Sequence, residues 1–427
     1  MKTILLGACY LSAITILISG CNAPLSQTDE EENLLAEYFG EKISVKSPMP
    51  TKQINQIALS STQHSYVKGS NKFAFGLLES LYASDEKTSM VFSPLSIYLD
   101  LAMVANGTDG KAREEILDAF GQDDISQLNS FCNTVMEGLP AVDLSSSVKL
   151  ANAIISDKSY PIRKTFKKEM GDVFYGVVES LPFEKWDFVT DRINSWVSDC
   201  TEGLIPTILD EYQDETMAYL LNALYFKSDL VYPFDQKQTV QRSFHTPESA
   251  VSINFMSGQF EIPYESTDVF SSISLPLGKE KFCMTVFLPQ GGYTVNDVIS
   301  KIKEGTGIRS STESVIVCLP KFKTESSFEC QSVLNQLGIS TLFGPCDFEH
   351  MLENSLPMRI SSVLHKATVS LDENGVEASA ATVSGVMATS SNDNRPVYTF
   401  VADHPFVYLI QEKTSGVVLF SGVFTGK

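Results

Sequence analysis

The chain has 427 residues, of which 43% are apolar and 20% are charged, and it contains 25 Gly and 18 Pro. This composition excludes collagen-like, coiled-coil and wholly disordered proteins. The 32 basic and 52 acidic residues give a net charge of −20, which would repel both a nucleic-acid backbone and an anionic membrane surface. We therefore expect no nucleic-acid partner and no charge-driven contact with a membrane.

The first twenty residues have the pattern of an export signal. Lys2 is followed by a long apolar run that ends in Ile-Ser-Gly directly before Cys21. This ending resembles the lipobox of bacterial lipoproteins, so we expect residues 1–20 to be removed and Cys21 to carry a lipid. An ordinary signal peptide and an N-terminal membrane anchor are the alternatives. The lipid would anchor the exported protein to the bacterial cell envelope, at the outer membrane, facing either the periplasm or the surface.

Residues 21–65 are polar and interrupted by prolines. They include the acidic run 29–32 and a short helical pattern near 34–39. This composition is typical of a flexible tether, here between the lipid and a folded domain at 66–427. The acidic run has two open interpretations, a signal for surface export or a solvated linker.

Sequence motifs of catalytic and metal sites are missing. The chain has no GxSxG, HExxH, Walker or GxGxxG pattern, and its five histidines lie far apart in sequence. Its eight cysteines include no CxxC pair, which disfavours a zinc site. Apart from Cys9 and Cys21, most of them are expected to be small core residues. We therefore expect a protein that is not an enzyme and that holds no metal or cofactor.

Helical patterns fill the first half of the folded region. Apolar residues recur at helical spacing from Phe73 to Leu81. Ser93 and Pro94 form a typical helix start, a capping serine followed by proline at the first helical position. Asp109 begins another helix that ends near Phe120, and further helices are predicted at about 125–137, 163–171 and 188–200.

Strand patterns dominate the rest. The predicted strands are 150–155, 217–226, 282–288, 314–319, 363–371, 397–401, 406–410 and 417–420. Neither a repeat nor a linker interrupts residues 69–427. We therefore predict one large α+β domain, although the length alone would allow about three domains.

One segment, residues 373–395, does not suit an ordinary fold. A connection of about twenty residues between two strands is uncommon in a compact domain and is usually functional or disordered. Read with the two-residue period of a strand, one face carries Val376, Ala378, Ala380 and Thr382. That face has no charge, and its side chains are small or β-branched. The segment is therefore composed like a buried strand but placed where a loop is expected.

Six motifs in order make the chain similar to the serpins over essentially all of 69–427. The residues that carry this resemblance are 91–97, 108–116, 222–227, 365–378, 402–406 and 416–422. The resemblance implies a single-domain fold with three β-sheets, about eight or nine helices and an exposed reactive-centre loop at about 373–395. It also implies a monomeric inhibitor of serine-type, and possibly cysteine-type, endopeptidases.

An inhibitory serpin is a suicide substrate. The protease cleaves the loop and is trapped as an acyl-enzyme while the loop inserts into the main sheet. By resemblance, the hinge of that movement comprises Glu373, Gly375, Val376, Glu377, Ala378, Ser379, Ala380, Ala381 and Thr382. Its small residues argue against the alternative, a non-inhibitory serpin that acts as a binding or chaperone-like protein.

The bond to be cleaved is placed by resemblance at Thr389–Ser390, with Met387 and Ala388 as alternatives for the residue before the cut. All candidates are small or apolar. They would suit a protease of elastase-, subtilisin- or chymotrypsin-like specificity, which would form a covalent complex with the inhibitor.

A polar cluster beneath the main sheet is also implied by the resemblance. Its members are Ser93, Ser96, Asn222 and His365. Such residues, called the shutter, lie where the strands separate to admit the loop. Plain buried hydrogen bonding is the simpler interpretation, and we expect both roles. A catalytic envelope protein or a glycan-binding lipoprotein is a more distant alternative for the whole chain.

Overall fold

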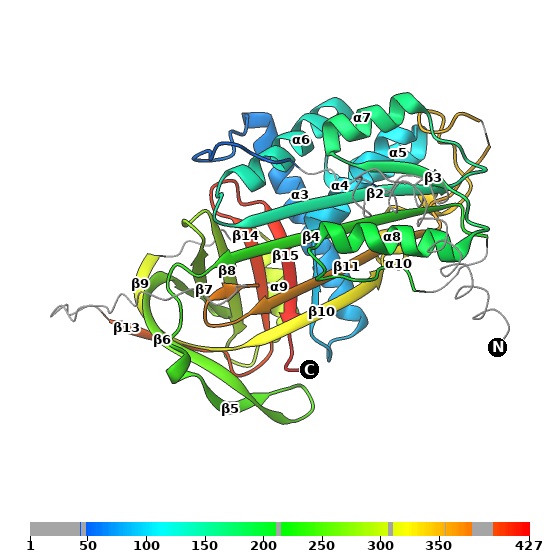
Figure 1. The fold of residues 1–427 in the computed structure, drawn as a ribbon. Helices are drawn as coiled ribbons and strands as arrows, with labels where there is room; N and C mark the ends of the chain where they lie inside the picture. The colour runs from blue at the N-terminus through cyan, green and yellow to red at the C-terminus, as the bar shows by residue number, and fades with distance from the viewer. Residues whose placement is uncertain (1–42, 44–47, 211–214, 306–310, 355, 378–395) are drawn as a thin grey trace, which may run out of the picture. The chain divides into compact units, whose positions relative to one another are not determined.

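The computed structural model describes residues 43, 48–210, 215–305, 311–354, 356–377 and 396–427. The described residues from 48 onward form an α+β body in which eight α-helices accompany two β-sheets (Figure 1). The helices are α3 (Ser61–Ser84), α4 (Pro94–Gly107), α5 (Gly110–Phe120), α6 (Ile125–Ala141), α7 (Lys164–Phe174), α8 (Trp186–Cys200), α9 (Val295–Lys303) and α10 (Gln331–Gln336). Among the described residues, none of these helices is long and apolar enough to cross a bilayer.

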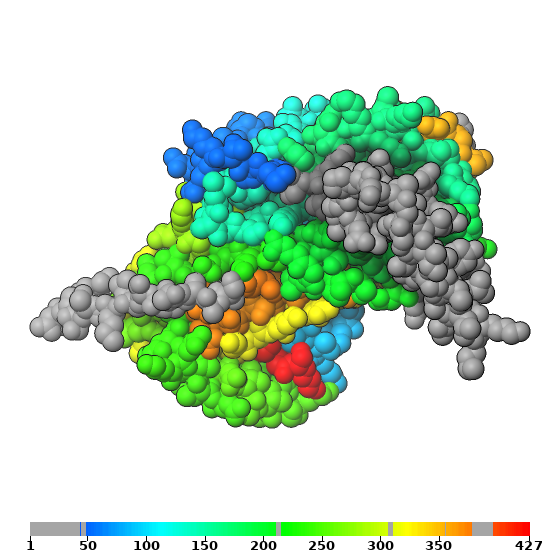
Figure 2. Space-filling model, viewed as in Figure 1, coloured from blue at the N-terminus to red at the C-terminus, as the bar shows by residue number. Residues whose placement is uncertain are grey.

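The six-stranded sheet is the part that matters for the site. Its strand order is β10 (Phe322–Glu329), β11 (Ser362–Leu371), β12 (Gly375–Val376), β4 (Ala218–Asp229), β2 (Ser147–Asp157) and β3 (Val177–Leu181). Strand β4 is almost continuously buried, as expected for a central strand with both faces covered. Helix α8 crosses the near side of β2 and β4, and α4 lies behind them (Figure 1). The space-filling view shows β10 and β11 at the surface, in yellow and orange (Figure 2).

The second sheet has nine strands. Its main path runs through β1 (Met90–Phe92), β15 (Val418–Phe424), β14 (Phe406–Glu412), β8 (Phe282–Pro289), β7 (Phe270–Leu277), β6 (Ala250–Ser266), β9 (Ser311–Pro320) and β13 (Val397–Val401). Strand β5 (Val240–His245) pairs with β6 beside this path.

Hydrogen bonds therefore connect the described strands into two sheets, whereas three sheets were expected. The reason is the length of β6, which has 17 residues. One end of β6 pairs with β7, and most of its length pairs with β9. A single long strand thus joins two regions that a shorter strand would have left as separate sheets.

Helix α4 forms the centre of the core. Every residue of α4 except Asn106 is buried, which is the pattern of a helix surrounded by protein. Its start is as predicted, because Ser93 accepts a hydrogen bond from the Ser96 N–H and Pro94 occupies the first turn. The hydrophobic core continues from α4 into both sheets.

The first described helix begins earlier than residue 66. Helix α3 starts at Ser61, where Ser60 and Gln63 form a reciprocal capping box. Ile57 is buried in the core, and the Ile54 N–H donates to the Ala141 carbonyl at 2.9 Å. The boundary predicted at 65/66 therefore falls inside a helix, since a polar sequence concealed a capped helical start.

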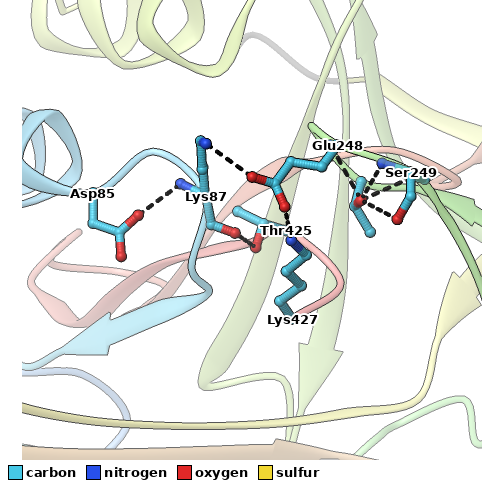
Figure 3. Close-up of polar contacts among 7 residues, drawn as sticks. Asp85, Lys87, Glu248, Ser249, Thr425 and Lys427 are labelled. Atoms are coloured by element: carbon cyan, nitrogen blue, oxygen red, sulfur yellow. Dashed lines mark hydrogen bonds and ion pairs between the residues drawn. The ribbon is translucent and has the colours of Figure 1, made fainter.

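The C-terminus is fixed by an ion-pair cluster (Figure 3). Glu248 accepts from Lys87 Nζ at 2.8 Å and also pairs with Lys427. The Thr425 hydroxyl donates to the Lys87 carbonyl at 2.8 Å. The two lysines lower the pKa of Glu248 to about 2.

Candidate functional site

The candidate site is the place where β4 and β11 separate. Residues Ser362–His365 of β11 pair in parallel with Tyr219–Asn222 of β4, and Asn222 opposite His365 is the last pair. Towards the other end of β11 the short strand β12 lies between them, antiparallel to both. We call the Asn222–His365 position the fork. Below the fork, towards Ser362, the two strands pair directly. Above the fork, towards Leu371, they are joined only through β12.

A tight turn returns the chain from β11 into β12. The Asp372 N–H donates to the Gly375 carbonyl at 3.0 Å, and Asp372 Oδ1 accepts from the Asn374 N–H at 2.8 Å. Gly375 has φ +154°, and a Cβ there would lie 2.3 Å from the Ser228 carbonyl oxygen. Only glycine allows the two backbones to approach this closely.

Glu373 anchors this turn to its surroundings. Its buried carboxylate pairs with Lys321 Nζ at 2.8 Å and accepts from the Thr239 hydroxyl at 2.8 Å. Burial raises the pKa of Glu373, but the bonds from Lys321 and Thr239 outweigh burial and leave the pKa below its ordinary value. The Glu373 carbonyl also accepts from the Phe234 N–H at 2.9 Å. Glu373 is therefore charged and held from two sides.

Val376 and Glu377 are the last described residues before the loop. Val376 is 1% exposed and belongs to the hydrophobic core, where it lies opposite Leu371 and Ser228. Glu377 has a left-handed backbone, φ 53°, and its N–H donates to the Ser370 carbonyl at 3.0 Å. Partial burial raises the pKa of Glu377, although Lys323 and Lys227 oppose this effect. The uncharged Val376 thus lies in the sheet, and the acidic Glu377 lies at the margin of the sheet.

The four predicted shutter residues lie together at the fork. The Ser93 N–H donates to His365 Nε2 at 2.9 Å, and the Ser93 hydroxyl donates to that of Ser96 at 3.0 Å. His365 Nδ1 is hydrogen-bonded to Asn222 Oδ1. All four side chains are buried, and burial lowers the pKa of His365 to about 3. The imidazole is therefore neutral at ordinary pH, which suits a structural hydrogen bond.

Two further polar residues share this region and were not predicted. Asp100 of α4 is fully buried, and its Oδ2 accepts from Asn222 Nδ2 at 2.9 Å. Asn152 of β2 lies opposite Asn222 in the strand register and is also buried. The sequence did carry a signal for Asp100, because it is the one charged residue in the apolar stretch 94–107.

Several predicted site residues lie outside the described residues. They are the lipid-attachment residue Cys21, the hinge residues Ala378, Ser379, Ala380, Ala381 and Thr382, and the candidates for the cleaved bond, Met387, Ala388, Thr389 and Ser390. Their roles remain predictions, as do the hinge and shutter roles of the residues placed above.

Six cysteines and one group of potential metal ligands lie elsewhere in the described part of the chain. Six cysteines are unpaired in the described part of the chain, and five of these are buried. Asp109, Glu349 and His350 lie close enough together to share an ion, but all three are exposed. Asp109 already pairs with Arg113 at 3.2 Å, which would compete with a cation.

Comparison with known proteins gives one consistent family. The family model "Serpin (serine protease inhibitor)" matches residues 68–426. Serpin-Z2A of Triticum aestivum is 31% identical over 374 residues, which are 82% of this chain and 94% of the relative.

Solved structures agree with this family. The structure of Arabidopsis AtSerpin1 in the native stressed conformation has a TM-score of 0.75 and 28% identity, covering 86% of this chain and 98% of the other. Human thyroxine-binding globulin complexed with thyroxine shares the fold, with a TM-score of 0.78 at 20% identity, covering 85% and 98%. The chain belongs to the serpin family, whose members are generally protease inhibitors rather than catalysts.

Proposed function

We propose that this serpin is an inhibitory one, a suicide substrate for a serine-type endopeptidase of elastase-, subtilisin- or chymotrypsin-like specificity. The observation that carries the proposal is Val376, which lies in the sheet between β11 and β4 and is 1% exposed. Val376, the first hinge residue with an apolar side chain, thus occupies the position of an inserting strand. After Glu377, the sequence continues with small and uncharged residues from Ala378 to Thr382.

The chemistry starts at the loop. The protease serine Oγ attacks the carbonyl carbon of the residue before the cut, proposed to be Thr389, and forms an ester. The C–N bond breaks, and the leaving amine takes a proton to become the new N-terminus at Ser390. The freed loop then inserts between β4 and β11 before water hydrolyses the ester. Around twelve new backbone hydrogen bonds at about 1 kcal/mol each would contribute on the order of 10 kcal/mol.

The location is part of the proposal. We propose that Cys21 carries a lipid and that the protein acts at a bacterial envelope, where proteases from outside would reach the loop. The Ile-Ser-Gly-Cys sequence at residues 18–21 supports this assignment. Mass spectrometry of the membrane fraction should find a lipid-modified N-terminal peptide, and Cys21→Ser should release the protein from the membrane. An unmodified N-terminus at another residue would contradict the proposal.

The inhibition experiment mixes the chain from residue 21 onward, carrying Cys21→Ser, with elastase, subtilisin, chymotrypsin and trypsin. We expect a complex that survives denaturing electrophoresis with at least one of the first three proteases. We also expect release of a C-terminal peptide of about four kilodaltons, since about forty residues of average composition follow the cut. The first residue of that peptide identifies the cleaved bond.

Cleavage between residues 386 and 392 without any stable complex would contradict inhibition. That result would move the non-inhibitory alternative, a binding or chaperone-like protein, into first place. Trypsin is the internal control, because the only basic residue in 378–395 is Arg395, well after the proposed bond.

A further inference from the structure

The buried cluster at the fork contains a hydrogen-bond chain whose direction can be assigned. The Ser93 backbone N–H can only donate, so His365 Nε2, 2.9 Å away, must accept and cannot carry a proton. A neutral imidazole then carries its proton on Nδ1. That proton is donated to Asn222 Oδ1. The amide of Asn222 is thereby oriented with its nitrogen away from His365.

The next member of the chain is Asp100. With the amide oriented this way, Asn222 Nδ2 points to Asp100 Oδ2 at 2.9 Å. A fixed backbone donor on one side of the cluster thus dictates that Asp100 must accept on the other. The chain of contacts runs from β11, through β4, to helix α4, and so connects both strands of the fork to the core.

The surroundings of Asp100 favour its uncharged form. Its side chain is fully buried, and Oδ1 has no hydrogen-bond partner among the described residues. Burial raises the pKa of Asp100 well above its ordinary value. Because Oδ2 accepts, the proton belongs on Oδ1. Asn152, the cross-strand neighbour of Asn222, is a further buried polar side chain in this region and comes from β2.

Two other titratable groups belong to this buried region. His365 faces the cluster from β11 and is neutral, as argued above. Cys330, directly before α10, interacts electrostatically with Asp100, and burial raises the pKa of its thiol. Neither supplies a positive charge that would favour a carboxylate.

We infer that Asp100 is a positioning residue that, as an uncharged carboxyl group, locks the Asn222 amide and so holds the fork between β4 and β11 closed. The Asn222–His365 pair is the last direct pair of these strands, so a loop that inserts beyond it must separate them. Loss of the acceptor on Asp100 leaves a buried amide N–H unpaired and weakens the closed state. The inference rests on the proposed function only in that loop insertion is the event being regulated.

The test measures opening of the fork without a protease. A fluorescent synthetic peptide with the sequence of residues 376–388 is incubated with the purified chain, and its uptake is followed by anisotropy. We expect Asp100→Ala to accelerate uptake on the order of tenfold, the effect of one buried unpaired donor. Asp100→Asn should take up peptide at the wild-type rate, because its amide oxygen still accepts from Asn222. Equal rates for wild type and Asp100→Ala would overturn the inference.

A second measurement remains decisive if Asp100→Ala does not fold. An acid whose pKa is raised by folding contributes stability below its unfolded pKa, and this contribution is lost as the pH rises towards its folded pKa. The amide of Asp100→Asn does not ionise, so this variant loses no stability as the pH rises. Its Tm should therefore exceed the wild-type Tm by a margin that grows from pH 4 to pH 8. If the Tm difference between Asp100→Asn and wild type stayed constant from pH 4 to pH 8, Asp100 would be charged or would only fill space. That result would overturn the inference.

The two results are independent of inhibition. If the chain traps no protease but the Asp100 variants behave as expected, the fork is closed as inferred and the proposed function is wrong. If it traps protease but the variants match wild type, the proposed function stands and this role of Asp100 is wrong.

Discussion

The two ends of strand β11 face β4 in different ways. At the lower end the strands pair directly, and their side chains join a buried polar cluster with α4. At the upper end they are held apart by two residues of β12, and the adjacent turn is fixed by the Lys321–Glu373 ion pair. At the lower end β4 and β11 are in direct contact, whereas at the upper end the two residues of β12 already lie between them. If the loop inserts as proposed, the difference implies that insertion would begin in a prepared position at the upper end and be controlled at the fork.

Val376→Arg is expected to give the largest effect, because it places a charge in the inserted position at the upper end. Burying an unpaired guanidinium is much more costly than burying valine. The yield of stable protease complex should fall by more than about tenfold while cleavage of the loop continues. Val240→Arg, on an exposed β5 position, is the matched control and should inhibit normally. A variant at Val376 that traps protease as well as wild type would exclude hinge insertion.

Gly375→Ala tests the close approach at the turn. The new Cβ would meet the Ser228 carbonyl oxygen at 2.3 Å, so the backbone must shift. We expect a loss of about 3 kcal/mol or more in free energy of unfolding. Gly203 also has a positive φ, +80°, but has open space around it, so Gly203→Ala should cost only about 1 kcal/mol. Chemical denaturation of both variants measures the loss in free energy of unfolding. Equal losses for the two variants would contradict a steric conflict at Gly375.

Lys321→Met removes the partner of the buried Glu373 carboxylate. We expect the free energy of unfolding to fall by about 1–3 kcal/mol at pH 7. Because the pKa of Glu373 is lowered on folding, its contribution is present above the ordinary value and is lost as the pH falls through the folded value. The difference from wild type should therefore shrink below pH 4. Lys366→Met, which breaks a longer ion pair to the half-exposed Glu325, is the control and should cost less than about 1 kcal/mol.

Glu248→Gln should have the smallest effect, because its ion pairs are exposed and lie far in sequence from both ends of β11 (Figure 3). We expect the Tm to fall by less than about 2 °C at low salt and not at all in concentrated salt. The lowered pKa of Glu248 puts this contribution above pH 4.5, and it is lost as the pH falls towards about 2. A change in peptide uptake by this variant would mean that the fork responds to general stability.

Much of the fold was predictable because local signals agreed with the final packing. The Ser93-Pro94 start, the helix from 110 and the strand at 363–371 are all found within a residue or two of their predicted places. Strands β6 and β7 were missed, since their serines and Gly258 weaken the apolar pattern. The segment that contains β12 has the composition of a buried strand, but its pairing could not be predicted, because its partner Ser228 lies more than a hundred residues away.

The residues of the candidate site also fall into those that the sequence could predict and those that it could not. Ser93, Ser96, Asn222 and His365 could be named from family resemblance, and the structure places them in one cluster. Asp100 could not, since a single acidic residue in an apolar helix does not reveal which strand it will meet. Its role depends on a contact across 122 positions of sequence, which only the folded chain creates.

The register of β12 also predicts which residues an inserted loop would face in β11 and β4. Val376 opposite Leu371 and Ser228 fixes the register, and continuing it two residues at a time brings Thr382 opposite both His365 and Asn222. The first hinge residues would therefore fill space above the fork, and Thr382 would be the first to displace the direct pair. A peptide of residues 376–381 should leave the His365 imidazole NMR signal unchanged, whereas one of residues 376–384 should shift it. If the loop inserts in this register, the Asn222–His365 pair would be the first contact between β4 and β11 that it has to displace.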